Sequence, residues 1–243
     1  CFTLVLAVAG AFLLRNVPAE KGLNPIAADD SETAIGKGSA NDRPDWSQVY
    51  RSKTAWHLGV AYIAFGFSYI IYVTFFFKML VAEGGYTTTG AGRLFMLMGW
   101  CSLLCGLIWG SMSDVVGRRY ALLSVYLVQA VAYALVSLWP SNAAYIVSSV
   151  MFGITAWSIP GIMAAACGDL FGSRLAPASL GFITLFFGVG QVISPGIAGA
   201  MADAAGSFSS AFSLAAIVAT LGAVGALSLP DDRSRGAAVP DSR

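Results

Sequence analysis

Two long uncharged runs, separated by a short charged turn, limit what this chain can fold into more than any other feature of its sequence. The runs cover 94–112 and 120–140 and contain 19 and 21 residues. A helix of roughly 20 apolar residues crosses the hydrocarbon core of a bilayer, which is about 30 Å thick. The runs therefore predict two membrane-spanning helices joined by a tight turn at a membrane surface.

The composition of the whole chain agrees with a membrane protein. Apolar residues make up 57% of the sequence and charged residues 11%, whereas a soluble domain carries about 25% charged residues. With one histidine and no cluster of acids, bases or metal ligands at one membrane face, the sequence predicts no enzyme, metal site or cofactor. It also lacks the basic surface that nucleic-acid binding needs.

The basic residues are distributed unevenly and predict the orientation. Twelve of the 14 Lys and Arg fall in the segments 15–53, 118–119, 174 and 233–243, which the predicted helices place on one side of the membrane. Only Lys78 and Arg93 fall on the other side. Because Lys and Arg in short loops are retained in the cytoplasm, the charged turn and the C-terminus are predicted to be cytoplasmic. The bilayer is thus a predicted partner, most simply a bacterial inner membrane.

Read in order, the chain predicts an all-α polytopic membrane protein. Residues 1–15 are interpreted as the end of a membrane helix, and the polar stretch 16–54 as a cytoplasmic loop. Residues 55–230 are expected to form a six-helix unit, followed by a cytoplasmic tail at 231–243. The expected spans are 55–80, 90–112, 119–139, 143–167, 177–201 and 208–229, with Pro160 inside the fourth.

The charged turn carries a recognisable pattern, Gly-x-x-x-Asp-x-x-Gly-Arg-Arg, at 110–119. In a hairpin between two spanning helices, this pattern resembles the loop of the major facilitator superfamily that joins the second and third helices of each half. Val115 departs from the pattern, which usually has a basic residue there. The resemblance implies the six-helix C-terminal half of a twelve-helix bundle, preceded by the end of helix six, with a missing N-terminal six-helix half as its partner.

The resemblance also implies a cytoplasmic gate. An Asp at the end of one helix can pair with loop arginines, so Asp114 is expected to pair with Arg118, and Asp169 with Arg174. The alternative is that these charges only mark the membrane boundary. The complete set of predicted gate residues is Gly110, Asp114, Gly117, Arg118, Arg119, Asp169 and Arg174.

The fifth expected span contains a glycine-rich face on which Gly188, Pro195 and Gly199 share one side of the helix. It is interpreted as a helix-packing face, because small residues let two backbones approach closely. It loosely resembles the Gly-Pro-Gly motif of family antiporters. Packing is preferred to a direct role in mechanism.

Several side chains in the spans are candidates for contact with a small-molecule substrate. Gln129 and Gln191 are costly inside a membrane unless they are paired or face water, so each either lines a substrate path or ties two helices together. Tyr62 and Tyr69 belong to an aromatic stripe that faces either a central cavity, where it would stack on a ring-bearing or sugar-like substrate, or lipid. Trp157, near Pro160, is a further candidate.

Residues 56–69, 83–85 and 167–177 narrow the resemblance to the bacterial YbfB-type branch of the superfamily. The function implied is secondary active transport of a small solute by alternating access, in uptake or efflux. No Asp or Glu lies within an expected span, although proton-coupled carriers normally place a titratable group there. A sensor or scaffold derived from a carrier, which does not transport, is the alternative.

Overall fold

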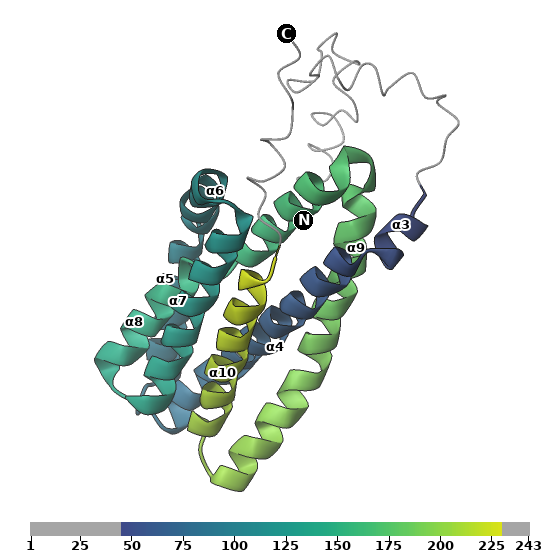
Figure 1. Ribbon diagram of the computed structural model, residues 1–243. Coiled ribbons are helices and arrows are strands. Elements are labelled where there is room, and N and C mark those ends of the chain that lie inside the picture. Colours follow the sequence, from purple (N-terminus) through teal and green to yellow (C-terminus); the bar gives the residue numbers. More distant parts are fainter. Residues whose placement is uncertain (1–44, 230–243) are drawn as a thin grey trace, which may run out of the picture. The chain divides into compact units, whose positions relative to one another are not determined.

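The computed structural model describes residues 45–229, and within this range every regular element is a helix (Figure 1). The expected helix end at 1–15, most of the loop at 16–54 and the tail at 231–243 lie outside the described residues. The helices are α3 (Ser47–Arg51), α4 (Lys53–Ala82), α5 (Thr88–Ser102), α6 (Cys105–Val116), α7 (Arg118–Leu138), α8 (Asn142–Gly153), α9 (Ser158–Ala205) and α10 (Ser209–Leu227).

By length and hydropathy, four helical segments in the described range can cross a membrane, or five if α5 and α6 count as one bent span. One of the four, Asn142–Ala205, has 64 residues and would be about 96 Å long if it were straight. It is not straight, because Gly172 has φ 73° and ψ 167° and reverses the chain. Figure 1 shows α9 as two arms that meet at this turn, so the segment supplies two crossings.

Two of the expected spans are interrupted. The span expected at 90–112 consists of α5 and α6, which meet at a bend of 40°. The span expected at 143–167 is broken at 154–157, between α8 and α9. Pro160 follows this break and occupies the first turn of α9, where the missing N–H has no intrahelical partner to lose. The chain therefore interrupts the helix just before the proline and not at it.

Helix α4 forms the centre of the bundle, packing most extensively on α9 and α10, while α7 packs on α10. The core is rich in aromatic side chains, and the largest fully buried ones include Tyr72, Tyr126 and Tyr133. The buried hydroxyl groups of Tyr72 and Tyr126 have hydrogen-bond partners on other segments of the chain. The Tyr72 hydroxyl lies 2.8 Å from Ser148 Oγ, and the Tyr126 hydroxyl donates to the Ala61 carbonyl at 2.7 Å.

Candidate functional site

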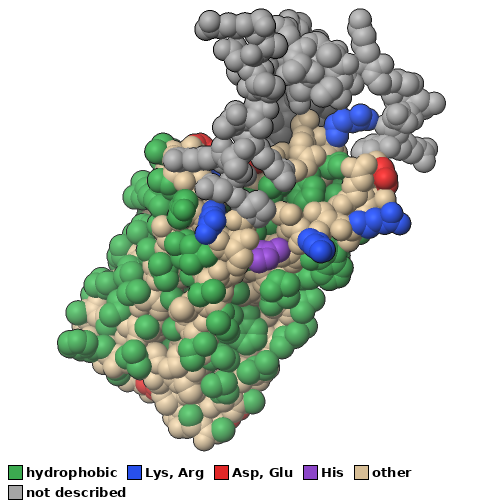
Figure 2. Space-filling view, in the orientation of Figure 1, with side chains coloured by type: hydrophobic (Ala, Val, Ile, Leu, Met, Phe, Trp, Pro, Cys, Tyr) green, Lys and Arg blue, Asp and Glu red, His purple; other side chains and the backbone are tan. Residues whose placement is uncertain are grey.

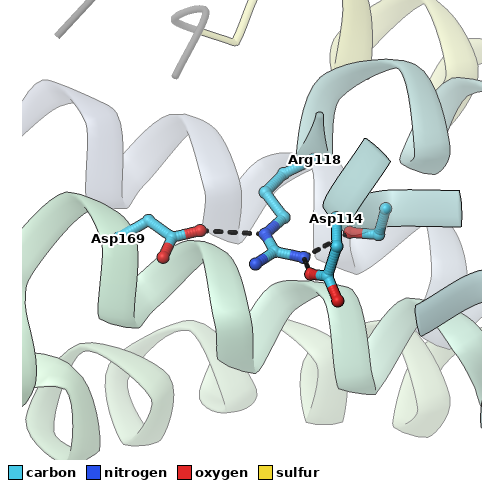
Figure 3. A network of polar contacts seen from close by, with 4 residues as sticks. Asp114, Arg118 and Asp169 are labelled. Atoms are coloured by element: carbon cyan, nitrogen blue, oxygen red, sulfur yellow. Dashed lines mark hydrogen bonds and ion pairs between the residues drawn. The ribbon is translucent and has the colours of Figure 1, made fainter. Parts of the chain in front are cut away.

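The charged turn folds into a polar network centred on Arg118 (Figure 3). Arg118 Nη1 lies 2.5 Å from Asp114 Oδ1 and 2.7 Å from Ser113 Oγ, and Nε donates to Asp169 Oδ2 at 2.8 Å. The Arg118 side chain is 20% exposed, whereas Asp114 is 67% exposed and Asp169 43%. We call these four residues the Arg118 network. It joins the end of α6, the start of α7 and the first arm of α9.

The local backbone explains how Arg118 reaches both carboxylates. Gly117 ends α6 and begins α7 with φ 94°, a conformation that favours glycine. Arg118 follows Asp114 by four residues, and the tight turn brings the two side chains into contact. Gly172 has a similar positive φ and ends the first arm of α9 just after Asp169. The two glycines thus bring two helix ends and one helix start to the same end of the bundle, which we call the Arg118 end.

The helix dipoles do not stabilise the charges of the Arg118 network at the helix ends where they lie. Negative side chains are stabilised near helix N-termini and positive ones near C-termini. Here Asp114 and Asp169 lie in the last turns of their helices, and Arg118 is the first residue of α7. Each charge is therefore in the less favourable position for its own helix. Their mutual pairing provides the stabilisation that the helices do not.

The partner of Asp169 in this network is Arg118, whereas the sequence suggested Arg174. Arg174 is exposed and lies just beyond Gly172, on the second arm of α9. Arg119 points differently from Arg118, with its guanidinium carbon 5.5 Å from the Tyr120 ring and a buried Nε that has no hydrogen-bond partner among residues 45–229. Gly110, one turn before Asp114, has no atom within 4 Å of the position a Cβ would occupy.

Towards the middle of the bundle, the break at 154–157 is supported by neutral side chains. Trp109 Nε1 donates to the Ile154 carbonyl at 2.7 Å, and Gln129 Nε2 donates to the Thr155 carbonyl at 3.2 Å. The Trp157 N–H donates to Cys105 Sγ at 3.3 Å. Because an unpaired backbone group in an apolar interior is costly, these contacts stabilise the interruption. We call residues 154–157 with these three supports the α8–α9 break.

The two interruptions of the bundle meet at this level. Cys105 is the first residue of α6, directly after the α5–α6 bend, and its Sγ also lies 2.9 Å from Ser158 Oγ, at the start of α9. On one side of this level α5 packs on α8, and on the other side α6 packs on α9. Two adjacent interruptions therefore separate α6 and the first arm of α9, which end at the Arg118 network, from α5 and α8.

The two glutamines have different surroundings. Gln129 is fully buried and also accepts a hydrogen bond from the Tyr133 hydroxyl at 3.4 Å. Of its two expected roles, this geometry favours the one in which Gln129 ties helices together, and contact with a substrate stays a prediction. Gln191 is partly exposed, and its side chain makes no hydrogen bond to a described residue. It lies one turn along α9 from Phe187.

The aromatic stripe on α4 is divided by the fold. Tyr62 is 4% exposed and stacks on Phe65 and Phe187, with ring centroids 6.0 and 4.9 Å away. Tyr62 thus packs inside the bundle and faces neither an open cavity nor lipid, because the second arm of α9 covers it. Tyr69 is partly exposed, and its ring lies 5.8 Å from that of Trp157, which is 58% exposed.

Tyr69 and Trp157 form the best candidate for contact with a solute. They come from α4 and from the α8–α9 break, and both rings lie on the same side of the bundle because they touch. Neither the Tyr69 hydroxyl nor the Trp157 indole N–H is hydrogen-bonded to a described residue. Both groups are therefore available as donors on an aromatic surface.

The residues expected on the packing face of the fifth span are not the ones at which α9 approaches α4, so a packing role for them stays a prediction. A Cβ at Gly188 would meet no atom within 4 Å, and one at Gly199 would make only an ordinary contact of 3.8 Å with Phe75. Pro195 is partly exposed. The close approach occurs at Gly190, where a Cβ would lie 2.5 Å from the Ile63 carbonyl oxygen, and at Gly66, 2.2 Å from that of Phe187.

The sequence contained signals for several residues that it did not single out. Cys105, Trp109 and Ser113 are the buried residues of α6 and lie on one face at intervals of four, so each places a polar atom on the same side of an apolar helix. Gly190, Ser194 and Ala198 are similarly buried residues of α9 at intervals of four, and Gly190 approaches α4. No group of His, Cys, Asp and Glu within 45–229 has the arrangement of a metal site.

Comparisons with known proteins agree with this architecture. A family model described as "Uncharacterised MFS-type transporter YbfB" matches residues 33–227. The crystal structure of the E. coli fucose:proton symporter FucP is similar with a TM-score of 0.62 at 19% sequence identity. The similarity covers 74% of this chain but only 43% of the symporter, and at this identity it shows the fold alone. No curated protein matches the chain.

Proposed function

The chain belongs to the YbfB-type family of major facilitator transporters, and on this premise we propose that it is the C-terminal half of a secondary carrier for a small solute. Its partner is a second six-helix half, and the solute binds between the halves near the membrane midplane, as in other carriers. The Arg118 end faces the cytoplasm of a bacterial inner membrane, in accordance with the distribution of Lys and Arg.

The observation that carries this proposal is that Arg118 contacts carboxylates from two helices at one end of the bundle. Asp114 is separated from Arg118 only by the Gly117 turn, so this pair moves as a local unit. Asp169 is 51 residues away on α9. The Arg118–Asp169 contact is therefore the one that breaks when the cytoplasmic side opens, while Asp114 and Ser113 keep Arg118 in position.

The α5–α6 bend and the α8–α9 break support a gate whose moving portion begins at these two interruptions. Residues 105–116 and the arm 158–171 pack on each other beyond the interruptions. A change at the level of Cys105 and Trp157 would carry these two segments together, because their far ends are joined through Arg118. A solute that contacts Trp157 would thus act directly on the start of the arm 158–171.

The candidate solute wall is aromatic and neutral. Tyr69 and Trp157 supply a stacking surface and two free donors. Gln191, on α9, is a separate partly exposed amide. Such a wall suits a ring-bearing solute with acceptor groups, including a sugar. The fold similarity to a fucose:proton symporter is a reason to include neutral sugars among the solutes tested.

The test uses proteoliposomes that contain the complete protein and a defined panel of neutral sugars, aromatic acids and amino acids. The parent should accumulate at least one solute above empty vesicles, measured by mass spectrometry of the lumen with and without a pH gradient. Trp157→Ala should raise KM for that solute more than it lowers Vmax. Solutes that raise the melting temperature without crossing the membrane would contradict transport and favour a sensor.

The orientation can be tested separately by labelling single cysteines in a cysteine-free background. Ser173 and Asp203 are exposed and lie at opposite ends of the second arm of α9. We expect a cysteine at 173 to react with an impermeant maleimide only in inverted vesicles, and one at 203 only in intact cells. The reverse pattern would overturn the proposed orientation. Ser113 is unsuitable because it is 1% exposed.

A further inference from the structure

A second cluster of basic side chains lies at the Arg118 end, where α3 meets α4. Arg51, Lys53, Trp56, His57 and Val60 line a pocket of about 370 Å³. Its volume falls within the range of small-molecule sites, roughly 300–1,000 Å³. We call it the α3–α4 pocket. It is separate from the Arg118 network and shares no residue with it.

The cations of this pocket are not neutralised by the described part of the chain. Arg51 and Lys53 are exposed, and neither forms an ion pair with a carboxylate within residues 45–229. Asp45, just before α3, interacts with Arg51 through charge but forms no close ion pair with it. Its carboxylate accepts a hydrogen bond from the Ser47 N–H, and the hydrogen bonds from Ser47 lower its pKa. Among residues 45–229, the two cations of the pocket are thus left for an anionic ligand to neutralise.

One wall of the pocket is held rigidly. Trp56 Nε1 donates to the Tyr50 carbonyl at 2.8 Å, and its ring packs edge-on against Phe182 and Phe186 at 5.4 and 5.3 Å. The ring is nevertheless 50% exposed. Tryptophan is enriched at the membrane–water interface, where its ring lies at the level of the lipid headgroups. Trp56 thus places the pocket at headgroup depth.

The opposite side of the pocket continues into an apolar surface. His57 Nε2 donates to the Gly225 carbonyl at 2.9 Å and so fixes α4 against α10. Val60 and Val224, next to these two residues, are 60% and 57% exposed. Figure 2 shows the histidine beside Lys and Arg side chains, with hydrophobic and neutral side chains on the surface leading away from them. A ligand here meets charge at one end and hydrocarbon at the other.

From this arrangement we infer that the α3–α4 pocket binds an anionic phospholipid. Its phosphate lies between Arg51 and Lys53, its headgroup rests against Trp56, and an acyl chain follows Val60 and Val224. A free phosphate would use the two cations but would gain nothing from the apolar surface. A zwitterionic lipid would use the apolar surface but would carry no net charge for the two cations. Lipid binding at this site does not require transport, so it can be tested independently of the proposed carrier function.

The test measures lipid binding to the full chain, purified in a neutral detergent, by native mass spectrometry. Dioleoylphosphatidylglycerol should bind more tightly than dioleoylphosphatidylcholine. Each Lys or Arg near a membrane surface contributes about 1 kcal/mol of attraction to anionic lipid, which corresponds to about fivefold in affinity. The double variant Arg51→Ala with Lys53→Ala should therefore lose about 25-fold in phosphatidylglycerol affinity, with unchanged helical content by circular dichroism.

The matched control is Lys78→Ala with Arg93→Ala, which removes the same charge at the other end of the bundle and should change the affinity less than twofold. Trp56→Leu should weaken phosphatidylglycerol binding while both cations remain. Equal losses in the two double variants would show general electrostatic attraction and overturn the site. Displacement of the lipid by millimolar inorganic phosphate, or equal binding of phosphatidylcholine, would also contradict it.

Discussion

The interior of the bundle and its Arg118 end both contain interrupted helices, but they stabilise the interruptions by different chemistry. At the α8–α9 break, the freed backbone groups are satisfied by Trp109, Gln129 and Cys105, all neutral. At the Arg118 end, positive-φ glycines end the helices and the contacts between them are ionic and partly exposed. Both regions thus solve the problem of an interrupted helix, with neutral donors in one and charges in the other.

The difference follows from access to water. Inside an apolar bundle an unpaired group has no solvent to replace a lost partner, so its contacts are expensive to break. An exposed ion pair loses little when it separates, because water solvates both charges and the pair contributes about 0–1 kcal/mol. The interior contacts are therefore suited to keeping a fixed shape, and the Arg118 network to opening and closing. Substitutions in the two regions should separate stability from gating.

The largest effect is expected where α4 and α9 touch. Gly190→Ala would place a methyl group 2.5 Å from the Ile63 carbonyl oxygen and 2.8 Å from the Phe67 nitrogen. The two backbones must move apart, and we expect a loss of about 2–3 kcal/mol in the free energy of unfolding. Gly188→Ala, two residues away, meets no atom and should be neutral or stabilising by up to about 1 kcal/mol. Denaturation in mixed micelles measures both, and equal losses would contradict the observed helix contact.

A smaller effect is expected at the α8–α9 break. Gln129→Leu leaves the Thr155 carbonyl without its side-chain donor and the Tyr133 hydroxyl without its acceptor. A buried group that loses its partner costs about 1–3 kcal/mol, so the free energy of unfolding should fall by about that amount. Gln191→Leu makes the same chemical change at an amide with no hydrogen bond to a described residue and should cost less than about 0.5 kcal/mol. A larger loss at 191 than at 129 would reverse the two assignments.

The smallest effect on stability, but a specific one on gating, is expected for Asp169→Asn. It removes the charge that Arg118 contacts across the bundle, and an exposed pair contributes up to about 1 kcal/mol. In the complete protein this should shift the closed-to-open ratio by up to about fivefold. A cysteine at Gln191 should then react faster with a water-soluble maleimide added from the cytoplasmic side.

Asp203→Asn, at an exposed position at the other end of α9, should change neither the labelling rate nor the stability. Asp114→Asn should resemble Asp169→Asn but with a weaker effect, because Ser113 still holds Arg118 in place. An unchanged labelling rate in both aspartate variants would mean that the Arg118 network is only a boundary feature, as the alternative interpretation of these charges holds.

Some contacts of the candidate site could be predicted from the sequence and others could not. The pairing of Asp114 with Arg118 was predictable because a glycine turn of known type brings the two side chains together within five residues. The contact of Asp169 with Arg118 was not, since it depends on where the first arm of α9 ends relative to α7. The sequence identified Gln129 as a costly side chain in a membrane. Its partners lie on α7 itself and in the α8–α9 break. Whether Gln129 joins two helices or contacts a substrate therefore depends on the position of the break.

The sequence by itself determined the all-helical membrane class and the family resemblance, because long uncharged runs, charged turns and glycines act locally along the chain. The tertiary structure decided which face of each helix is covered. Gly190 and not Gly188 meets α4, and Tyr62 is buried while Tyr69 stays accessible beside Trp157. In helices that are apolar on every side, hydrophobic periodicity distinguishes no inner face, so the close packing of neighbouring helices makes this choice.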